Sequence, residues 1–273
     1  MPSTKQSISN KKASFRACIE WGITMRNSLF KRLLLSILVI VLALPIAACP
    51  SITPGSTTTT TSTTSTTTQP AIQACGGEKL PAVDEAAENP DFKEFRDQLL
   101  AAVRRKDVDF LKEHLDENIR GSFGSEGNGI DSFMQMWGLT TDPEKSKLWL
   151  ELGEVMRLGG TFTDQTKTEF TAPYVYSNWP EKYDAFTYAA IIANNVNLRS
   201  APNTNSSVVC RLNHNIVKLT SPAINKSGWN QVQTTSGTSG YILGTYVRSS
   251  VDYRARFKKE DDVWKMVFFI AGD

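Results

Sequence analysis

The sequence has few of the residues on which most catalytic and metal sites depend. Only two of its 273 residues are histidine, His114 and His214, and only four are cysteine. Neither histidine has cysteine or histidine partners at the spacing of a zinc site, and we expect both on the surface. The one histidine that follows Cys210 lies four residues after it, too close to act as a base from another element. The sequence therefore predicts a non-catalytic protein without a metal or a cofactor.

The body of the chain also lacks an excess of basic residues. Residues 1–48 hold seven of the 30 Lys and Arg residues and one of the 28 Asp and Glu residues, which leaves 23 basic and 27 acidic residues for the remainder. A nucleic-acid-binding surface needs clustered positive charge, so we expect no nucleic-acid partner. Hydrophobic residues make up 40% of the chain, which is enough for a folded core, and the length allows one or two domains.

The N-terminal segment has the pattern of an export signal. Residues 33–48 carry no charge, and Arg26, Lys31 and Arg32 precede them. This run is shorter than the roughly 20 residues of a membrane-spanning helix, and a basic region before an apolar one is typical of a secretory signal. We therefore expect residues 1–48 to be a signal peptide, with Met25 as an alternative start.

The end of this segment, Ile46-Ala47-Ala48-Cys49, resembles the bacterial lipobox. In lipoproteins of that family the cysteine is diacylated and becomes the mature N-terminus. The resemblance implies that Cys49 carries lipid. It also implies a lipoprotein anchored in a membrane of the cell envelope, with its folded body outside the cytoplasm. A plain signal peptide or an uncleaved anchor remains the alternative.

A low-complexity linker follows the predicted anchor. Fifteen of the twenty residues from Ser51 to Pro70 are serine or threonine. Such a segment buries little apolar surface and stays extended and solvated. We expect residues 49–84 to form a Ser/Thr-rich linker that holds the folded part away from the membrane.

Residues 85–186 predict the first segment of an α+β outer domain. Apolar residues recur at helical spacing in three stretches: Phe92, Phe95, Leu99 and Val103; Val108, Leu111 and Leu115; Ile130, Phe133, Met134 and Trp137. Asp107 is placed to cap the second stretch and Gly138 to end the third. Asp142-Pro143 predicts the start of a further helix. The buried face of that helix would carry Leu148, Leu152 and Val155.

Residues 187–250 predict short strands separated by Gly, Pro and Asn turns, a pattern typical of a small barrel. The stretch from Asn195 to Pro202, NVNLRSAP, is similar to the opening signature of bacterial SH3 domains. Further landmarks of that family follow in order: Val208-Val209, Ile216–Leu219, Gly228–Val232, Gly240–Ile242 and Tyr246-Val247. The resemblance implies an inserted all-β SH3-like barrel. Before Ile216 the family commonly has glycine; here we expect Asn215 to adopt the left-handed conformation of that turn.

The resemblance to bacterial SH3 domains also implies a ligand site, because barrels of this family resemble peptide binders. The candidate ligand-binding residues are Trp229, Tyr241 and Tyr246, with Asn197 and Arg199 from the opening stretch. Aromatic side chains bury a large area with few rotatable bonds, and an arginine can bind a peptide carboxylate through two hydrogen bonds. For Trp229 and Tyr241, a place in the barrel core is the alternative.

Cys75 and Cys210 are the two remaining thiols of the exported chain if Cys49 carries lipid. Exported proteins meet oxidising conditions, which favours a disulfide between them. Two free thiols remain equally open, because pairing cannot be read from a sequence.

Residues 251–273 predict a β-hairpin. Tyr253, Ala255 and Phe257 alternate with basic residues; after a turn, Trp264, Met266, Phe268 and Ile270 alternate with Val263, Lys265, Val267 and Phe269. A two-stranded hairpin is not stable alone, so we expect it to complete the outer domain around the inserted barrel. Helices followed by such a hairpin resemble the NTF2-like architecture. The order of helices, barrel and hairpin also resembles that of bacterial SH3-containing lipoproteins.

Two functional interpretations follow. In the first, the chain is a non-catalytic, lipid-anchored envelope protein whose SH3-like domain binds cell-wall peptides or an envelope protein. In the second, it is an envelope enzyme or small-ligand binder that uses the cone-shaped pocket of NTF2-like folds. A polar-lined cavity inside the outer domain would favour the second, and a solid apolar core the first. The sequence offers no partnered acid and base there, so we favour binding.

Overall fold

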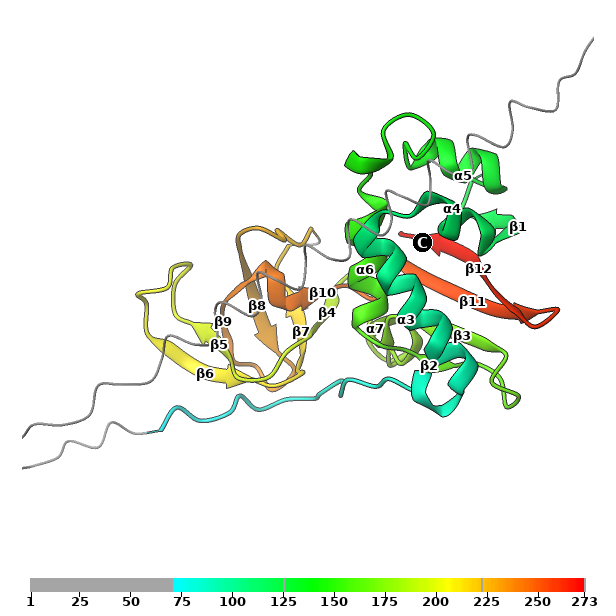
Figure 1. Cartoon of the computed structure of the whole chain (residues 1–273). Coiled ribbons are helices and arrows are strands. Elements are labelled where there is room, and N and C mark those ends of the chain that lie inside the picture. Colours follow the sequence, from blue (N-terminus) through cyan, green and yellow to red (C-terminus); the bar gives the residue numbers. More distant parts are fainter. Residues whose placement is uncertain (1–70, 125, 222, 273) are drawn as a thin grey trace, which may run out of the picture. The chain divides into compact units, whose positions relative to one another are not determined.

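The computed structural model describes residues 71–124, 126–221 and 223–272. The predicted signal peptide, Cys49 and the Ser/Thr-rich run up to Pro70 lie outside these residues. The described residues all belong to one compact unit of the chain. That unit contains two β-sheets and a few short helices, so the predicted α+β class is confirmed (Figure 1).

A five-stranded sheet takes its strands from both ends of the described residues. Its order is β1 (Leu115–Arg120), β12 (Val263–Ile270), β11 (Arg254–Glu260), β3 (Glu169–Ala172) and β2 (Thr161–Phe162). β11 and β12 form the antiparallel hairpin that the sequence predicts. The hairpin lies in the middle of the sheet, because β11 pairs with β3 and β12 pairs in parallel with β1. Residues before 187 and after 250 therefore build one sheet together.

Helices cover this sheet through their predicted apolar stripes. They are α3 (Pro90–Arg105), α4 (Val108–Glu113), α5 (Ile130–Met136) and α6 (Leu148–Arg157), with a 3₁₀ turn, η1 (Ala86–Glu88), before α3. A further short helix, α7 (Tyr174–Ser177), was not predicted and packs its buried Tyr174 and Val175 with Ala190 and Ile216. Asp107 caps α4 as expected, since its Oδ1 accepts a hydrogen bond from Phe110 N at 3.1 Å. Phe92 of α3 is fully buried, and its ring centroid lies 4.2 Å from that of Phe170 and 4.7 Å from that of Trp264. Apolar side chains thus fill the space between helices and sheet.

The helix predicted from Asp142 begins later than expected. Asp142-Pro143 opens a 3₁₀ turn, η2 (Pro143–Lys145), and α6 starts only at Leu148. Between them Ser146 has φ −58° and ψ 130°, which interrupts the helical path. Its Oγ accepts a hydrogen bond from Leu148 N at 3.2 Å and donates one to Trp137 O at 2.6 Å. Ser146 therefore stabilises the start of the helix in place of Asp142.

Leu115 does not belong to the helix that Asp107 caps. α4 ends at Glu113, and Leu115 starts β1. Met266 N donates to His114 O at 2.8 Å, so pairing with β12 begins where the helix ends. The long-range pairing overrides the local helical spacing.

β12 does not keep the alternation that the sequence predicts. Arg256 of β11 pairs with Phe268, whereas the next residue, Phe257, pairs with Met266. β12 therefore contains one extra residue at this point, a bulge that changes which side chains face the core. As a result Phe269, and not Phe268, is fully buried.

The second sheet has seven strands, each antiparallel to its neighbours. Their order is β10 (Val247–Arg248), β4 (Tyr188–Ile191), β7 (Ile216–Leu219), β8 (Trp229–Thr234), β9 (Ser239–Leu243), β5 (Val196–Arg199) and β6 (Val208–Leu212). A 3₁₀ turn, η3 (Gly244–Tyr246), joins β9 to β10. Neither sheet of the described residues is closed, so the strands show an antiparallel sheet in the predicted all-β region rather than a closed barrel.

The turn before β7 differs from its prediction. His214, and not Asn215, has the left-handed conformation, with φ +52°. Asn215 is fully buried and its amide is bonded on both sides: Oδ1 accepts from Asn213 N at 2.7 Å, and Nδ2 donates to Gly76 O at 3.2 Å. A buried amide needs such partners, so the reversal of the chain falls on the neighbouring residue.

Residues 73–80, which we call the strap, lie against the seven-stranded sheet. Ala74 forms a parallel bridge to Arg211 in β6, and Lys79 forms an antiparallel bridge to Asn215. Cys75 is joined to Cys210 by a disulfide across 135 residues of sequence. The sequence left two alternatives open for these cysteines, a disulfide and two free thiols. The structure has the disulfide. This part of the predicted linker is held on the sheet.

Candidate functional site

The candidate site is a cavity of about 230 Å³ on the seven-stranded sheet. Four of the five ligand-binding residues expected from the sequence line it: Asn197, Arg199, Trp229 and Tyr246. The remaining lining residues are Asn194, Asn195, Val196, Thr204 and Leu243. We call this set of nine residues the groove.

Three strands and one short turn position the groove side chains. Asn197 and Arg199 alternate along β5, Trp229 begins β8, and Leu243 ends β9 directly opposite Trp229. Tyr246 ends η3. Alternate residues of a strand share one face, and so do residues paired directly across two strands. The groove is therefore built on one face of β5, β8 and β9, with η3 beside it.

The groove combines accessible aromatic rings with one arginine. Tyr246 is 39% exposed and Trp229 is half-buried. Arg199 is also half-buried, and its Nη1 donates a hydrogen bond to Ser206 O at 2.7 Å. That bond uses one of the five N–H donors of a guanidinium and fixes its position. The remaining N–H donors of Arg199 are available to bind an anionic group in the groove.

Tyr241 is the one candidate that the structure does not place in the groove lining. It pairs with Arg199 across β5 and β9 and with Gln231 across β8 and β9. It therefore shares the face of the groove but lies two residues along β9 from Leu243. The side chain is half-buried and stands beside the groove.

The groove also contains five residues that were not predicted from the sequence: Asn194, Asn195, Val196, Thr204 and Leu243. Asn195 has a left-handed backbone, with φ +56°, and its N–H donates to Asn213 Oδ1 at 2.9 Å. Asparagine tolerates this conformation better than most residues and is common in turns. The Asn194-Asn195 pair, whose second residue opens the SH3-like stretch, was the available signal for a turn that borders the site.

Gly244 lets η3 approach the neighbouring loop. A Cβ atom at this position would lie 1.8 Å from Asn225 O, well inside contact distance. Gly244 N also donates a hydrogen bond to Gly228 O at 2.8 Å. Because η3 carries Tyr246, this close approach determines where the aromatic ring of the groove stands.

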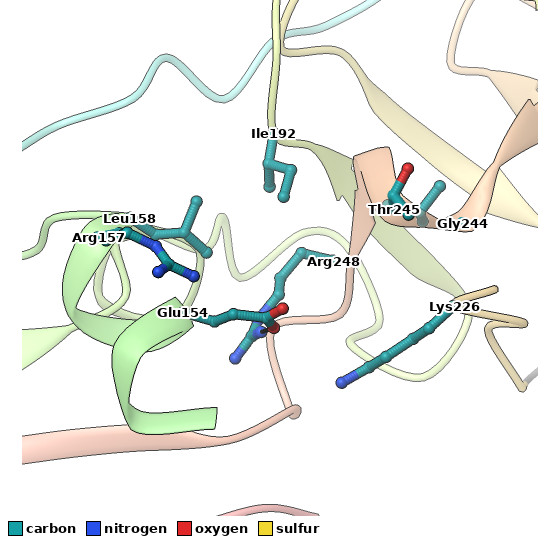
Figure 2. A pocket seen from close by; sticks show the side chains of 9 residues that line it. Glu154, Arg157, Leu158, Ile192, Lys226, Gly244, Thr245 and Arg248 are labelled. Atoms are coloured by element: carbon teal, nitrogen blue, oxygen red, sulfur yellow. Dashed lines mark hydrogen bonds and ion pairs between the residues drawn. The ribbon is translucent and has the colours of Figure 1, made fainter. Parts of the chain in front are cut away.

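A second cavity, of about 290 Å³, lies between α6 and η3 (Figure 2). Glu154 of α6 reaches Arg248 there, with 3.3 Å between Oε2 and Nη1. Asp252 Oδ2 lies 3.7 Å from the same Arg248 atom and 2.9 Å from Lys226 Nζ. The acids of this cluster pair with Arg248 and Lys226. We therefore interpret it as an ion network that joins α6 to the seven-stranded sheet.

The network shifts the pKa of Asp252. Burial acts to raise this pKa, but the charge of Arg248 and the hydrogen bond and charge of Lys226 outweigh burial and hold the pKa below its ordinary value. Asp252 is therefore ionised at neutral pH, as a partner of two cations must be.

Neither histidine lies in the groove. We expected both on the surface, but both are half-buried. The ring of His114 stacks on Phe110, with centroids 4.2 Å apart, and its Nδ1 lies 2.8 Å from Phe110 O. His214 Nδ1 lies 3.4 Å from the hydroxyl of Tyr174, whose pKa burial raises to about 12. In residues 71–124, 126–221 and 223–272, no group of three or more His, Cys, Asp or Glu side chains could hold a metal ion.

Comparison of the chain with protein-family models, with curated proteins and with solved structures found no match. Helices in the described part of the chain are all too short or too polar to cross a membrane.

Proposed function

We propose that this chain is a non-catalytic, lipid-anchored protein of the cell envelope that binds cell-wall peptides through the groove. The observation that carries the proposal is the meeting of Asn197, Arg199, Trp229 and Tyr246 around one cavity. These residues come from β5, β8 and η3, which are separated in sequence. Residues named from the sequence for ligand binding thus line one concave surface.

The chemistry of the groove suits a peptide. Side-chain amides both donate and accept hydrogen bonds, as a peptide backbone requires, and Asn194, Asn195 and Asn197 supply three of them. The rings of Trp229 and Tyr246 offer apolar area with a polar tip. At about 230 Å³ the groove is smaller than the roughly 300–1,000 Å³ of a typical small-molecule pocket. It therefore suits a short stretch of an extended chain.

Two resemblances support the proposed function, one to bacterial SH3 domains and one to the lipobox. The signature-like stretch Asn195–Pro202 includes β5, and the later landmarks fall on β6, β7, β8 and β9. We propose on this basis that the seven-stranded sheet is an SH3-like module. The lipobox-like stretch that ends in Cys49 supports an anchor, and the Ser/Thr-rich segment after it supports a spacer between membrane and groove.

The alternative function, an enzyme or small-ligand binder with an NTF2-like cone, has less support. Such a site needs a polar cavity between the five-stranded sheet and its helices. The space between the sheet and its helices is packed with buried aromatic and aliphatic side chains, among them Phe92, Phe170 and Phe257. A polar hollow of about 860 Å³ lies on the sheet as well, but its Arg256 and Lys265 alternate with buried residues, so it lies on the face away from this core. Apolar packing of this kind favours a supporting role for the five-stranded sheet.

Co-sedimentation with purified peptidoglycan sacculi tests the proposed function. The full chain, kept soluble in mild detergent, is expected to pellet with the sacculi. Tyr246→Ala should remain largely in the supernatant, because a groove ring is lost. Phe186→Ala is the matched control, since Phe186 is an aromatic residue that is 53% exposed and outside the groove. If the wild-type chain does not pellet, the proposal that it binds cell-wall peptides is wrong. An envelope protein is then the partner to test.

A further inference from the structure

A chain of hydrogen bonds connects the strap with the groove. Gly76 O, in the strap, accepts from Asn215 Nδ2 at 3.2 Å. Asn215 Oδ1 accepts from Asn213 N at 2.7 Å, and Asn213 Oδ1 accepts from Asn195 N at 2.9 Å. Asn195 lines the groove. Three successive side-chain hydrogen bonds therefore lead from the strap to one wall of the groove.

Backbone hydrogen bonds hold the same turn between the strap and the groove wall. His214 O accepts from Leu80 N at 2.7 Å on the strap side, and His214 N donates to Ala193 O at 3.2 Å on the groove side. Asn215 O accepts from Ile191 N at 2.9 Å. The turn at residues 213–215 is thus bonded to the strap and to the segment that leads into Asn195.

The strap is itself firmly attached. Cys75 and Cys210 are 6% and 7% exposed, and Cys75 N donates to Arg211 O at 2.7 Å. Leu80, at the other end, is 5% exposed and packs in a core cluster with Ile216. A covalent bond and a buried side chain therefore hold the two ends of the segment whose carbonyl group Asn215 binds.

We propose that Asn213 and Asn215 are positioning residues for the groove, which transmit the order of the disulfide-held strap to Asn195. This inference rests on the proposed function, because the order of a groove wall affects affinity only if the groove binds a ligand. A wall that is already ordered loses less conformational freedom on binding, and the ligand binds more tightly. In sequence the strap lies near the C-terminal end of the predicted linker, residues 49–84. The same linker therefore leads from the proposed anchor and supports the wall of the groove.

Removal of the Asn213 side chain interrupts the chain of hydrogen bonds from Gly76 through Asn215 and Asn213 to Asn195, and so tests the proposal. Asn213→Ala removes the acceptor of Asn195 N, and we expect sacculus binding by the full chain in detergent to fall about three- to tenfold, as for one lost hydrogen bond. Asn213→Asp keeps an acceptor oxygen for Asn195 N but loses the hydrogen bond that Asn213 Nδ2 donates to Arg211 O at 3.4 Å, so it should bind more tightly than Asn213→Ala. Asn118→Ala, at an exposed asparagine of β1 in the other sheet, is the matched control and should change nothing.

Hydrogen–deuterium exchange gives a readout that needs no ligand. In Asn213→Ala, and in the double variant Cys75→Ser with Cys210→Ser, amides of residues 191–199 should exchange faster than in the wild type. Asn118→Ala should leave that exchange unchanged, and Asn213→Asp should raise it less than Asn213→Ala does. Exchange in the five-stranded sheet should stay constant in the three asparagine variants, which separates a local loss of order from general unfolding. In the double cysteine variant, which is less stable as a whole, residues 191–199 should gain more exchange than the five-stranded sheet does.

The outcomes distinguish this inference from the proposed function. If the wild type binds sacculi while Asn213→Ala binds equally well and exchanges equally slowly, the positioning role is wrong. If the wild type does not bind sacculi, the proposed function fails and the exchange experiment alone decides. Faster exchange of residues 191–199 in Asn213→Ala would then still support the positioning role of Asn213, and unchanged exchange would overturn it.

Discussion

Arg248 Nη1 lies 3.7 Å from Asp252 Oδ2, and Lys226 Nζ lies 2.9 Å from the same oxygen. One carboxylate, only 17% exposed, is thus shared by two cations. On α6, Glu154 pairs with Arg248 at 3.3 Å and Glu151 with Lys226 at 3.7 Å. Because α6 belongs to the core of the five-stranded sheet while Arg248 lies in β10, the network links the two sheets.

The first prediction concerns the pH dependence of stability. A lowered pKa in the folded state means that the unfolded chain protonates Asp252 more readily. The stability from Asp252 is therefore complete above its ordinary pKa, about 3.9, and is lost as the pH falls through the lower folded pKa. Asp252→Asn should be less stable at pH 7 by about 1.5–3 kcal/mol, as for a hydrogen bond to a charged group.

Thermal denaturation at pH 7 and at about pH 3 measures this effect. The difference between the two melting temperatures should be smaller in Asp252→Asn than in the wild type. Asp131→Asn, at an exposed carboxylate, should keep the wild-type difference. Equal differences in all three proteins would show that Asp252 does not contribute in this way.

The second prediction concerns the disulfide. The Cys75–Cys210 bond closes a loop across 135 residues, so it restricts the unfolded chain strongly. Replacing both cysteines with serine should lower the free energy of unfolding by about 2–4 kcal/mol in chemical denaturation. Wild-type protein treated with a reductant should behave like the double variant. Two thiols that react with an alkylating reagent in the native, unreduced protein would refute the bond.

The third prediction concerns Gly244. An alanine here would place its Cβ 1.8 Å from a backbone oxygen, which cannot move as a flexible side chain can. Gly244→Ala should lower stability by about 1–3 kcal/mol and displace Tyr246. Gly124→Ala is the control, since the nearest atom to a Cβ there is 3.8 Å away. A normal melting temperature together with normal sacculus binding in Gly244→Ala would contradict the account of η3.

The fourth prediction concerns Cys49. Mass spectrometry of the mature protein from its native membrane should find Cys49 at the N-terminus with two acyl chains, since one chain alone anchors only marginally. Cys49→Ala should accumulate as an unprocessed or released chain. A mature N-terminus downstream of Cys49, without lipid, would show that Cys49 does not anchor the protein.

Much of the groove could be predicted because its residues sit in short, regularly patterned strands. Asn197 and Arg199 share a face of β5 by simple alternation, and Trp229 begins a strand that the pattern indicates. Tyr241 follows the same alternation, but the groove ends before it, and strand spacing alone does not show where a cavity ends. Asn195 was missed because a turn, rather than a strand, brings it to the site.

The features that could not be predicted depend on distant partners. Asn215 binds a carbonyl group 139 residues away in sequence, and this bond moves the left-handed residue of the turn to His214. The bulge that buries Phe269 instead of Phe268 arises from pairing with β11, where a register shift falls next to Arg256. Helical stripes such as that of Phe92 could be predicted, because their spacing is local.

The most direct measurement of the central claim is hydrogen–deuterium exchange of the full chain in detergent, with and without muropeptides released from purified sacculi. The account predicts slower exchange on binding in residues 194–199 and 243–246, which include seven of the nine groove residues, and no change in β11 and β12 of the five-stranded sheet. Protection confined to the five-stranded sheet, or no protection in the groove at saturating muropeptide, would contradict it.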